Sequence, residues 1–298
     1  MVQTIRDLVA AELSEPVDPR VTAVAEAIAA RHLPSSRAVL FYGSCLRERQ
    51  LEGRMLDFYL IVSDYRTAYE KSWLVTANRL IPPNVFYFEK GGLAAKYAVL
   101  TEADFAQECD ASARTASVFA RFSQPSRLAW VADEEARSRI ISIVALAAPA
   151  LLGLTRPTLT KEEASDPLQG WKKAFRLTYG AELRAERASR PEAIVDSDPE
   201  RYRRFAKAAG FPGKQSFSEI QRRTSEEAWR QFQRKGKRAS VLRLIKASFT
   251  FAGGAEYIVW KINRHAGTRI ELKPWQRRHP LLAGISLLPR LLRSGAIR

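Results

Sequence analysis

The sequence has few cysteines and histidines, and this scarcity excludes several classes of site. Its two cysteines and three histidines are spread through 298 residues, at Cys45, Cys109, His32, His265 and His279. A structural zinc site needs four such ligands close together, and a disulfide framework needs several paired cysteines. The sequence therefore predicts neither, which is typical of proteins in a reducing compartment.

Long hydrophobic runs are also absent. Residues 140–154, which make up nearly all of the longest uncharged run, fall short of the ~20 residues that a membrane-spanning helix needs. We interpret this run as a buried core helix broken by Pro149, with shallow insertion into a membrane as the alternative. Residues 1–12 mix acidic and apolar side chains at helical spacing, unlike a secretory signal or an arginine-rich transit peptide. We therefore expect a bacterial cytoplasmic location ahead of a mitochondrial matrix.

Acidic residues are scarce in the last third of the chain. Residues 201–298 contain 23 Lys or Arg and five Glu, a net charge of +18 in a chain whose total is +16. Such a region can bind RNA, DNA or an anionic membrane. Residues 280–298 mix Leu and Ile with Arg and hold no acid, as an interfacial helix would, and Trp260, Trp275 and Tyr257 suit a headgroup boundary. We expect peripheral attachment to an inner membrane, then a solvated or protein-covered face, and nucleic acid last.

The first half of the chain alternates short apolar runs with helical patterns. The length favours two domains, with a boundary near residues 135–160, after which the pattern is mostly helical. Thr101 resembles a helix N-cap, with Asp104 in the first turn. The predicted elements are a helix at 21–31, strands at 38–42 and 56–62, a helix at 68–80, and strands at 85–88 and 96–100. This order predicts an α+β fold with a mixed sheet.

Gly43 and Ser44 end one predicted strand, and Asp57 opens the next. Glycine lets backbone N–H groups approach phosphates closely, and the serine adds a small hydroxyl. An aspartate on the neighbouring strand can hold the magnesium that neutralises those phosphates. The pair suggests a nucleotidyl-transfer site, although an ordinary turn gives the same pattern.

A series of short motifs in a fixed order makes this suggestion more specific. Along the chain they are Tyr42-Gly43-Ser44, Met55-Leu56-Asp57-Phe58, Asn78, Val85-Phe86-Tyr87-Phe88, Lys96-Tyr97-Ala98-Val99, Arg121-Phe122-Ser123-Gln124-Pro125 and Thr178-Tyr179-Gly180-Ala181-Glu182-Leu183-Arg184. Over residues 38–190 the chain resembles the mitochondrial-type phosphatidate cytidylyltransferases. These are peripheral CDP-diacylglycerol synthases, also called mitochondrial translocator assembly and maintenance proteins.

The resemblance implies an architecture and a reaction. It implies a polymerase-β-like nucleotidyltransferase domain at 1–140, a helical or winged-helix-like domain at 141–240, and a basic membrane-associating region at 241–298. The reaction would transfer CMP from CTP to phosphatidic acid in phospholipid synthesis, with Mg²⁺ as cofactor, giving CDP-diacylglycerol and pyrophosphate.

The chemistry of single residues, together with the motif order, suggests a role for each. Asp57 is the leading metal ligand, and the candidates for a second carboxylate are Glu182, Asp64 and Glu89. Lys96 and Arg184 would neutralise or grip phosphates as catalytic residues. The predicted nucleotide contacts are Gly43, Ser44, Tyr42, Asn78, Tyr179 and Arg121.

Several positions depart from the family pattern. Cys45 replaces the glycine that follows the Gly-Ser pair in the family, and Tyr59 occupies the position where the second carboxylate of an Asp-x-Asp pair is expected. In the family's last motif, Glu182 replaces an aspartate and Ala185 replaces a methionine. Two other functions therefore remain open. One is a nucleotidyltransferase of the same fold acting on RNA, a protein or a small soluble acceptor, and the other is a catalytically silent membrane-associated scaffold.

Overall fold

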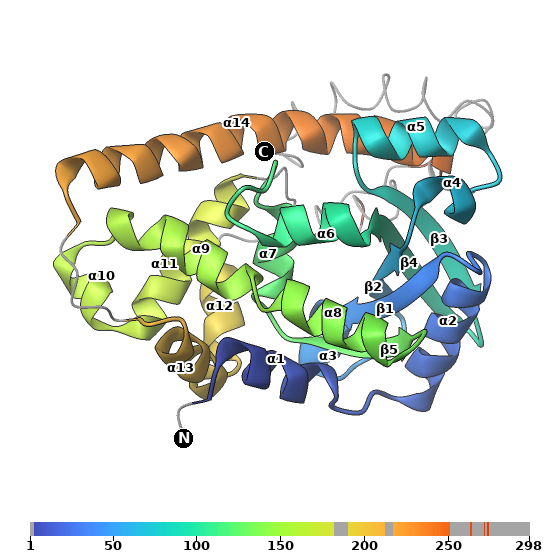
Figure 1. Ribbon diagram of the computed structural model, residues 1–298, viewed down its shortest axis with the longest axis horizontal. Coiled ribbons are helices and arrows are strands. Elements are labelled where there is room, and N and C mark those ends of the chain that lie inside the picture. The colour runs from blue at the N-terminus through green and yellow to red at the C-terminus, as the bar shows by residue number, and fades with distance from the viewer. Residues whose placement is uncertain are drawn as a thin grey trace.

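The computed structural model describes residues 3–181, 190–211, 217–250, 263, 271 and 273, and in this part the chain is an α+β protein. Five strands form one mixed sheet in the order β3-β4-β2-β1-β5, with helices on both faces (Figure 1). The strands are β1 (Ser36–Tyr42), β2 (Met55–Val62), β3 (Asn84–Lys90), β4 (Leu93–Thr101) and β5 (Ser126–Val131). The predicted mixed sheet is thus confirmed.

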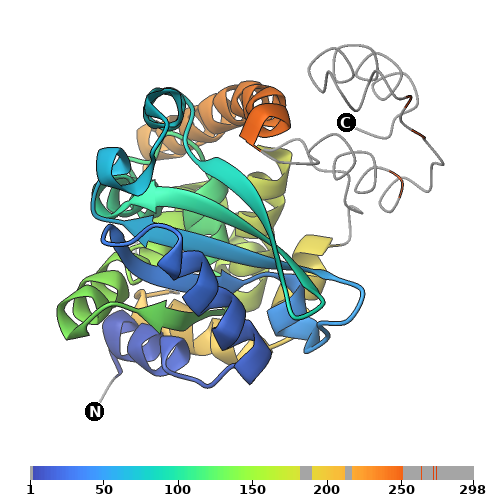
Figure 2. The same cartoon turned by 90° about the vertical axis from the view of Figure 1, so that its right-hand side faces the viewer.

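The sheet combines one parallel pair with three antiparallel pairs. β2 runs parallel to β4, whereas β1 is antiparallel to both β2 and β5, and β3 is antiparallel to β4. Side chains alternate between the faces of a strand, so the central strands contribute to two separate apolar clusters. Val39 and Phe41 point to the face covered by α2 (Pro19–Ala30), and Leu40 points to the opposite face, which packs against helices that include Ile5–Leu13 and Ser117–Phe122. The two layers of helices are seen in Figure 2.

Four helices of the first half begin at a side chain that caps them: Thr4, Asp18, Asp64 and Thr101. Thr101 accepts a hydrogen bond from the backbone N–H of Asp104 at 3.2 Å, which confirms the predicted start of α6 (Glu102–Cys109). The predicted helix at 68–80 is instead two helices, because the chain turns extended at Tyr69. The remaining helices here are α1 (Ile5–Leu13), α3 (Ser44–Glu48), α4 (Tyr65–Ala68), α5 (Ser72–Leu80) and α7 (Ser117–Phe122).

Strand β5 was not predicted. It is an edge strand of six residues that follows Pro125, and its half-buried side chains give a weak sequence pattern. Its position in the sheet comes from antiparallel pairing with β1, in which Tyr42 lies opposite Ser126.

The second half of the described chain is helical. Its elements are α8 (Glu134–Val144), α9 (Ala147–Thr155), the 3-10 turn η1 (Arg156–Thr158), α10 (Lys161–Ser165), α11 (Pro167–Gly180), α12 (Arg190–Asp196), α13 (Pro199–Ala208) and α14 (Glu219–Thr250). Every strand in the described residues belongs to the single sheet, so a winged-helix hairpin is not found in this part of the second half.

The uncharged run at residues 140–154 forms the end of α8 and most of α9. The break lies at Ala145 and Leu146, just before the predicted position, because Pro149 is tolerated in the first turn of α9. By length and composition, Glu134–Thr158 is apolar enough to cross a membrane, but 56% of its most apolar window is buried inside the protein. The side chains of Leu151 and Leu152 lie in the core, as expected for a core helix.

One apolar cluster continues from the sheet into the second half. It joins Leu40 and Phe122 to Trp171 and Trp229, and Ile140, at the predicted domain boundary, is part of it. The boundary at residue 140 also lies inside α8. The sheet and the helices that follow it therefore share a core, and the domain division stays a prediction.

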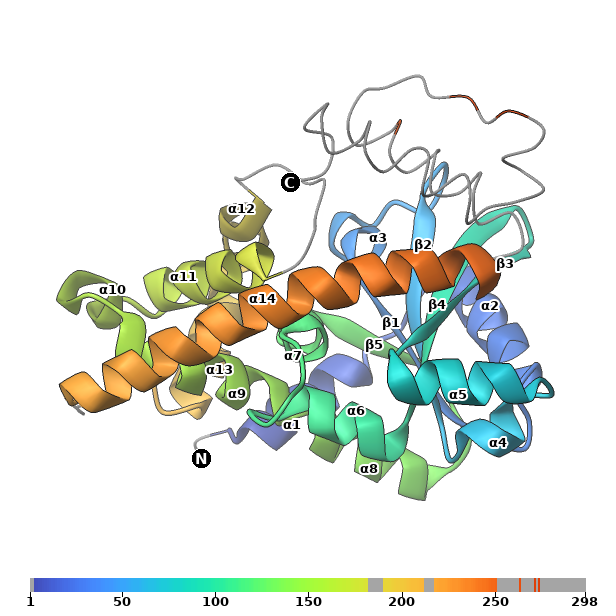
Figure 3. The same cartoon turned by 90° about the horizontal axis from the view of Figure 1, so that it is seen from above.

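Helix α14 is the longest described element and links the two halves. Trp229 Nε1 donates to Leu154 O at 3.1 Å, and Arg243 Nε donates to Pro82 O at 2.7 Å, near the edge strand β3. The helix therefore runs from the helical half to the edge of the sheet (Figure 3). Gly236 permits this path, since a Cβ there would lie 2.0 Å from Ala181 O.

Candidate functional site

Three neighbouring strands bring the turn after β1 together with Asp57 and Lys96. Tyr42 lies opposite Asp57 across the β1–β2 pair, and Asp57 lies opposite Lys96 across the β2–β4 pair. These three residues form a row across the three central strands β4, β2 and β1, near the end of β1 and the start of β2. The row lies on the face that α7 and the later helices cover. The proximity of Gly43 to Asp57 follows directly, because Gly43 ends β1 beside the start of β2.

Gly43 fits its position only as glycine. Its φ of +93° lies in a region that side chains rarely adopt, and a Cβ there would sit 2.8 Å from Asp57 Oδ2. Its carbonyl accepts from the backbone N–H of Arg47 at 3.2 Å, which starts α3. The turn and the Asp57 carboxylate are therefore in contact, with Ser44 at the first position of α3.

Asp57 and Lys96 form an ion pair at the centre of the row. Lys96 Nζ lies 2.8 Å from Asp57 Oδ1, and the two side chains remain 25% and 18% exposed. An ion pair that keeps some contact with solvent can exchange partners at low cost, unlike a fully buried pair. Both charges are therefore accessible to a ligand.

Two tyrosines border the pair. Burial, reinforced by the charge of Asp57, holds the pKa of Tyr42 well above its usual value, so the phenol stays protonated and can donate a hydrogen bond at neutral pH. Tyr59, two residues after Asp57 on the same side of β2, is 3% exposed and packs edge-on against Phe122 at 5.3 Å. Aromatic core therefore fills the place where a second carboxylate was expected.

Two arginines add positive charge around the row. Arg121 on α7 lies near enough to lower the pKa of Tyr42 by its charge, and its Nη1 donates to Ser117 O at 2.6 Å. Arg47 on α3 donates to Gln124 Oε1 at 3.0 Å. Arg47 was not predicted, although its place one helical turn after Gly43 was a usable signal. Lys96 and Arg121 are the cations whose charges act on Tyr42 beside Asp57, and such positive charge favours an anionic ligand.

Cys45 is an unsuitable nucleophile. Its thiol donates to Met55 O at 3.4 Å, and burial raises its pKa, so the reactive thiolate is disfavoured. Its side chain instead packs in the apolar cluster on the α2 side of the sheet.

Asn78 is not available to a nucleotide. It is fully buried, its side-chain amide donates to Val99 O at 3.0 Å, and its side-chain oxygen accepts from the backbone N–H of Asn84. The residue therefore fastens α5 to the sheet. This corrects the role that motif order assigned to it, because its polar atoms are already used by the backbone.

Asp64 lies too far from Asp57 to share a metal ion with it. Seven residues of extended chain separate them, about 23 Å along the strand direction. Asp64 instead caps α4 by accepting from the backbone N–H groups of Arg66 at 2.6 Å and Thr67 at 3.3 Å. The metal-ligand assignment is corrected accordingly.

The remaining predicted site residues lie on other elements than the row or outside the described residues. Glu89 is exposed on the edge strand β3, two strands from Asp57, and accepts from Tyr87 Oη at 2.8 Å. Tyr179 lies half-buried on α11 against the shared core. Glu182 and Arg184 lie outside the described residues, so their assignments stay predictions.

A preformed metal site is not found among the described residues. No group of three or more His, Cys, Asp or Glu side chains comes together in this part of the chain. Magnesium is nevertheless often held by one or two carboxylates together with substrate phosphates. Asp57 thus fits an ion that arrives with a triphosphate, whereas it does not form a complete site by itself.

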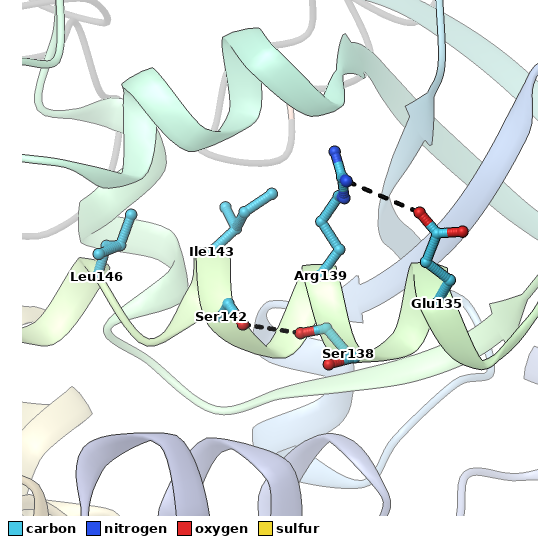
Figure 4. A pocket seen from close by; sticks show the side chains of 6 residues that line it. All are labelled: Glu135, Ser138, Arg139, Ser142, Ile143 and Leu146. Atoms are coloured by element: carbon cyan, nitrogen blue, oxygen red, sulfur yellow. Dashed lines mark hydrogen bonds and ion pairs between the residues drawn. The ribbon is translucent and has the colours of Figure 1, made fainter.

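A shallow groove on α8 lies apart from this row of residues. It is lined by Glu135, Ser138, Arg139, Ser142, Ile143 and Leu146 (Figure 4). Its polar groups are already paired. Arg139 contacts Glu135 at 3.7 Å and Glu102 at 3.4 Å, and the hydroxyl groups of Ser138 and Ser142 accept from Arg6 of α1 at 2.9 and 2.7 Å. None of the predicted site residues lines it.

Comparison with known proteins does not decide the function. No family model and no curated protein matches the chain. A crystal structure of a nucleotidyltransferase-like protein from Exiguobacterium sibiricum is similar at 10% sequence identity, with 92% of this chain and 91% of that chain covered and a TM-score of 0.27. Such values are too low to carry an argument, so the function is argued below from the site itself.

Proposed function

We propose that the protein is a nucleotidyltransferase whose centre is the row of Tyr42, Asp57 and Lys96 together with the adjoining turn at Gly43. The observation that carries the proposal is the contact of the glycine turn with the Asp57 carboxylate, next to an ammonium group on the adjacent strand. A triphosphate needs closely approaching backbone, compensating positive charge and a carboxylate for its metal ion. This row offers all three.

Each residue has a definite task in this proposal. The turn at Gly43 and Ser44 lets the phosphates approach the backbone, and Lys96, Arg47 and Arg121 neutralise their charge. Asp57 would hold magnesium together with the phosphate oxygens. When bound, that ion would neutralise charge that develops on the pyrophosphate.

We propose CTP and phosphatidic acid as the substrates, on the motif order described above. A phosphate oxygen of the lipid attacks the α-phosphorus of CTP, the bond from the α-phosphorus to the bridging oxygen breaks, and pyrophosphate leaves with the electron pair. The lipid phosphate is already ionised at neutral pH, so the reaction needs no protein base. Catalysis then rests on alignment and on charge neutralisation.

The lipid acceptor agrees with the uneven charge of the chain. The net charge of +18 in residues 201–298 would attract an anionic membrane, in which phosphatidic acid resides. On this proposal the protein works at the inner face of a bacterial membrane. RNA, a protein or a small soluble acceptor would make less use of the leucines and isoleucines at residues 280–298.

A silent nucleotide-binding scaffold is the second candidate, and one feature favours it. Lys96 already neutralises Asp57, and Tyr59 occupies the place of a second carboxylate. Such a site would still attract a triphosphate through its cations. It would bind without turning over.

Pyrophosphate release tests the proposal. We expect release by the full chain with Mg²⁺, CTP and phosphatidic-acid vesicles, and a loss of about 10²-fold or more in Asp57→Ala, because the metal-binding carboxylate is gone. Asp64→Ala is the matched control, since it removes an aspartate near the other end of β2 and should keep most activity.

The other outcomes discriminate among the candidates. CTP binding by calorimetry without release would support the scaffold, and release without lipid would support another acceptor. Equal losses in Asp57→Ala and Asp64→Ala, with both variants folded, would contradict the assigned centre.

A further inference from the structure

Helix α5 presents large apolar side chains to the outside. Trp73 is 45% exposed and Leu80 is 75% exposed, whereas Val75 and Asn78 on the opposite side are buried. Trp73 and Leu80 are seven residues apart, which is close to two helical turns, so they lie on one face. The outer face of α5 is therefore an apolar stripe.

The end of α14 lies beside this stripe and is fastened to it. Arg243 Nε donates to Pro82 O at 2.7 Å, and Lys246 Nζ donates to Ile81 O and, at 2.8 Å, to Pro83 O. The three carbonyl groups directly follow Leu80. The two helices lie on the same outer side of the molecule in Figures 1 and 3, and Leu242 of α14 adds a third apolar side chain that is 47% exposed.

Unbalanced positive charge surrounds these apolar side chains. The sequence holds no acid from residue 228 to residue 255. Four cations on α14 are exposed, and none lies within ion-pair distance of a carboxylate in the part of the chain that the structure describes: Arg234, Lys235, Lys237 and Arg238. Lys235 and Arg238 share a helix face with Leu242, at spacings of seven and four residues. Arg79 on α5 lies 4.0 Å from Asp64 and is therefore paired, so the unbalanced charge comes from α14.

This chemistry matches a lipid surface with anionic headgroups. Exposed apolar side chains next to a row of unpaired cations, with a tryptophan among them, suit the boundary between headgroups and acyl chains. A protein partner would have to supply many carboxylates, and a second copy of the chain would bring the same positive charge. Charge complementarity thus favours the membrane.

We propose that this α5–α14 surface is where the folded body rests on an anionic membrane. Trp73, Leu80 and Leu242 enter the headgroup boundary, and the exposed cations of α14 contact lipid phosphates. This is a contact in addition to residues 280–298. It rests on the membrane partner of the proposed function and is independent of nucleotidyl transfer.

Vesicle sedimentation with the full chain tests the surface. In vesicles of phosphatidylcholine with phosphatidylglycerol, we expect Trp73→Glu/Leu80→Glu to weaken binding roughly tenfold or more, since two apolar contacts are lost and two like charges are added. Ile220→Glu is the matched control: Ile220 is 77% exposed at the far end of α14, and its substitution should leave binding close to wild type.

A spectroscopic readout separates direct contact from an indirect loss of binding. Lipids brominated near the headgroup should quench wild-type fluorescence more than that of Trp73→Phe, which keeps an aromatic side chain in place. Equal quenching, or equal vesicle binding by the double variant and wild type, would overturn the proposal. Loss of a dimer in the double variant during sedimentation without lipid would assign the surface to a second copy instead.

The two proposals fail separately. No nucleotide is needed for the vesicle measurement, so an inactive protein can still confirm the surface. Conversely, pyrophosphate release that depends on phosphatidic acid, combined with unchanged vesicle binding by the double variant, would leave the enzyme assignment intact and remove only the α5–α14 surface.

Discussion

The two ends of β2 each have an aspartate nearby, and the two differ in what they bind. Asp57 pairs with a side chain, Lys96 Nζ, at 2.8 Å and touches the glycine turn. Asp64 accepts from two backbone N–H groups and caps α4. Because a cap cannot be given up without exposing the helix end, Asp64 is committed to structure. Asp57 can exchange its partner for a ligand.

The surroundings of the two aspartates follow the same division. Toward the Asp64 end, the side-chain amide of Asn78 donates to the backbone of Val99 and its oxygen accepts from the backbone of Asn84. The Tyr65 hydroxyl donates to Asp104 at 2.5 Å. Near Asp57, Lys96 and Asp57 are both partly exposed. The comparison teaches that polar side chains bound to the backbone build the fold, and that partly exposed charged pairs such as Asp57 and Lys96 are the candidates for function.

Replacing Gly43 should have the largest effect on activity at the Asp57 end. Gly43→Ala forces a Cβ to within 2.8 Å of Asp57 Oδ2 at a φ of +93°. A shift of the carboxylate by about 1 Å should lower pyrophosphate release ~10²-fold. Gly91→Ala is the control, because Gly91 has a φ of +59° with nothing within 4 Å of its Cβ, so only a backbone cost of ~1 kcal/mol in unfolding free energy is expected. Similar activities in the two variants would contradict the contact argument.

Replacing Lys96 should have a smaller effect, on nucleotide affinity. Lys96→Met removes a charge-assisted contact to phosphate, and we expect the Kd for CTP in calorimetry to rise roughly tenfold. Lys172→Met is the matched variant, since Lys172 Nζ lies 2.7 Å from Asp196 Oδ1 in the helical half. If both variants weaken CTP binding equally, the ion pair with Asp57 has no special role.

Replacing Asn78 should change stability and leave the site unchanged. Asn78→Ala removes two buried hydrogen bonds and leaves the backbone groups of Val99 and Asn84 without these bonds. We expect a loss of about 2 kcal/mol in the free energy of unfolding, measured with denaturant. Thr76→Ala, on the exposed side of α5, should cost much less. A higher Kd for CTP in Asn78→Ala at unchanged stability would restore the nucleotide-binding role of Asn78. It would also contradict the distinction between the Asp57 end and the Asp64 end of β2.

The sequence predicted four of the five strands. The patterns at 38–42, 56–62, 85–88 and 96–100 are short apolar runs bounded by turn residues, and they became β1, β2, β3 and β4. The edge strand β5 was missed, because its apolar residues form no comparable run. The single helix expected at 68–80 divides at Tyr69, which is 6% exposed and packs against Phe86. Tertiary packing decided that break.

The candidate site was predictable only in part. Gly43 and Asp57 were identified from a turn signal and its spacing to the next strand, which are local features. The row through Lys96 depends on β2 pairing in parallel with β4, a contact between segments about forty residues apart. Asn78 matched the motif order and Asp64 was a candidate carboxylate, yet their hydrogen-bond partners show structural roles. The partners of Asn78 are fixed by its burial against the sheet, and those of Asp64 by its position between the end of β2 and α4. A short sequence motif does not encode either.

By itself the sequence determined the alternation of apolar runs, the helix caps, the glycine at a position of positive φ and the concentration of positive charge after residue 200. These follow from local sterics and composition. Only the tertiary structure decided which aspartate is available to a ligand, where Lys96 lies and which face of α5 stays apolar and exposed. The physical reason is that availability depends on which polar groups the backbone has already used, and this is fixed when distant strands and helices pack together.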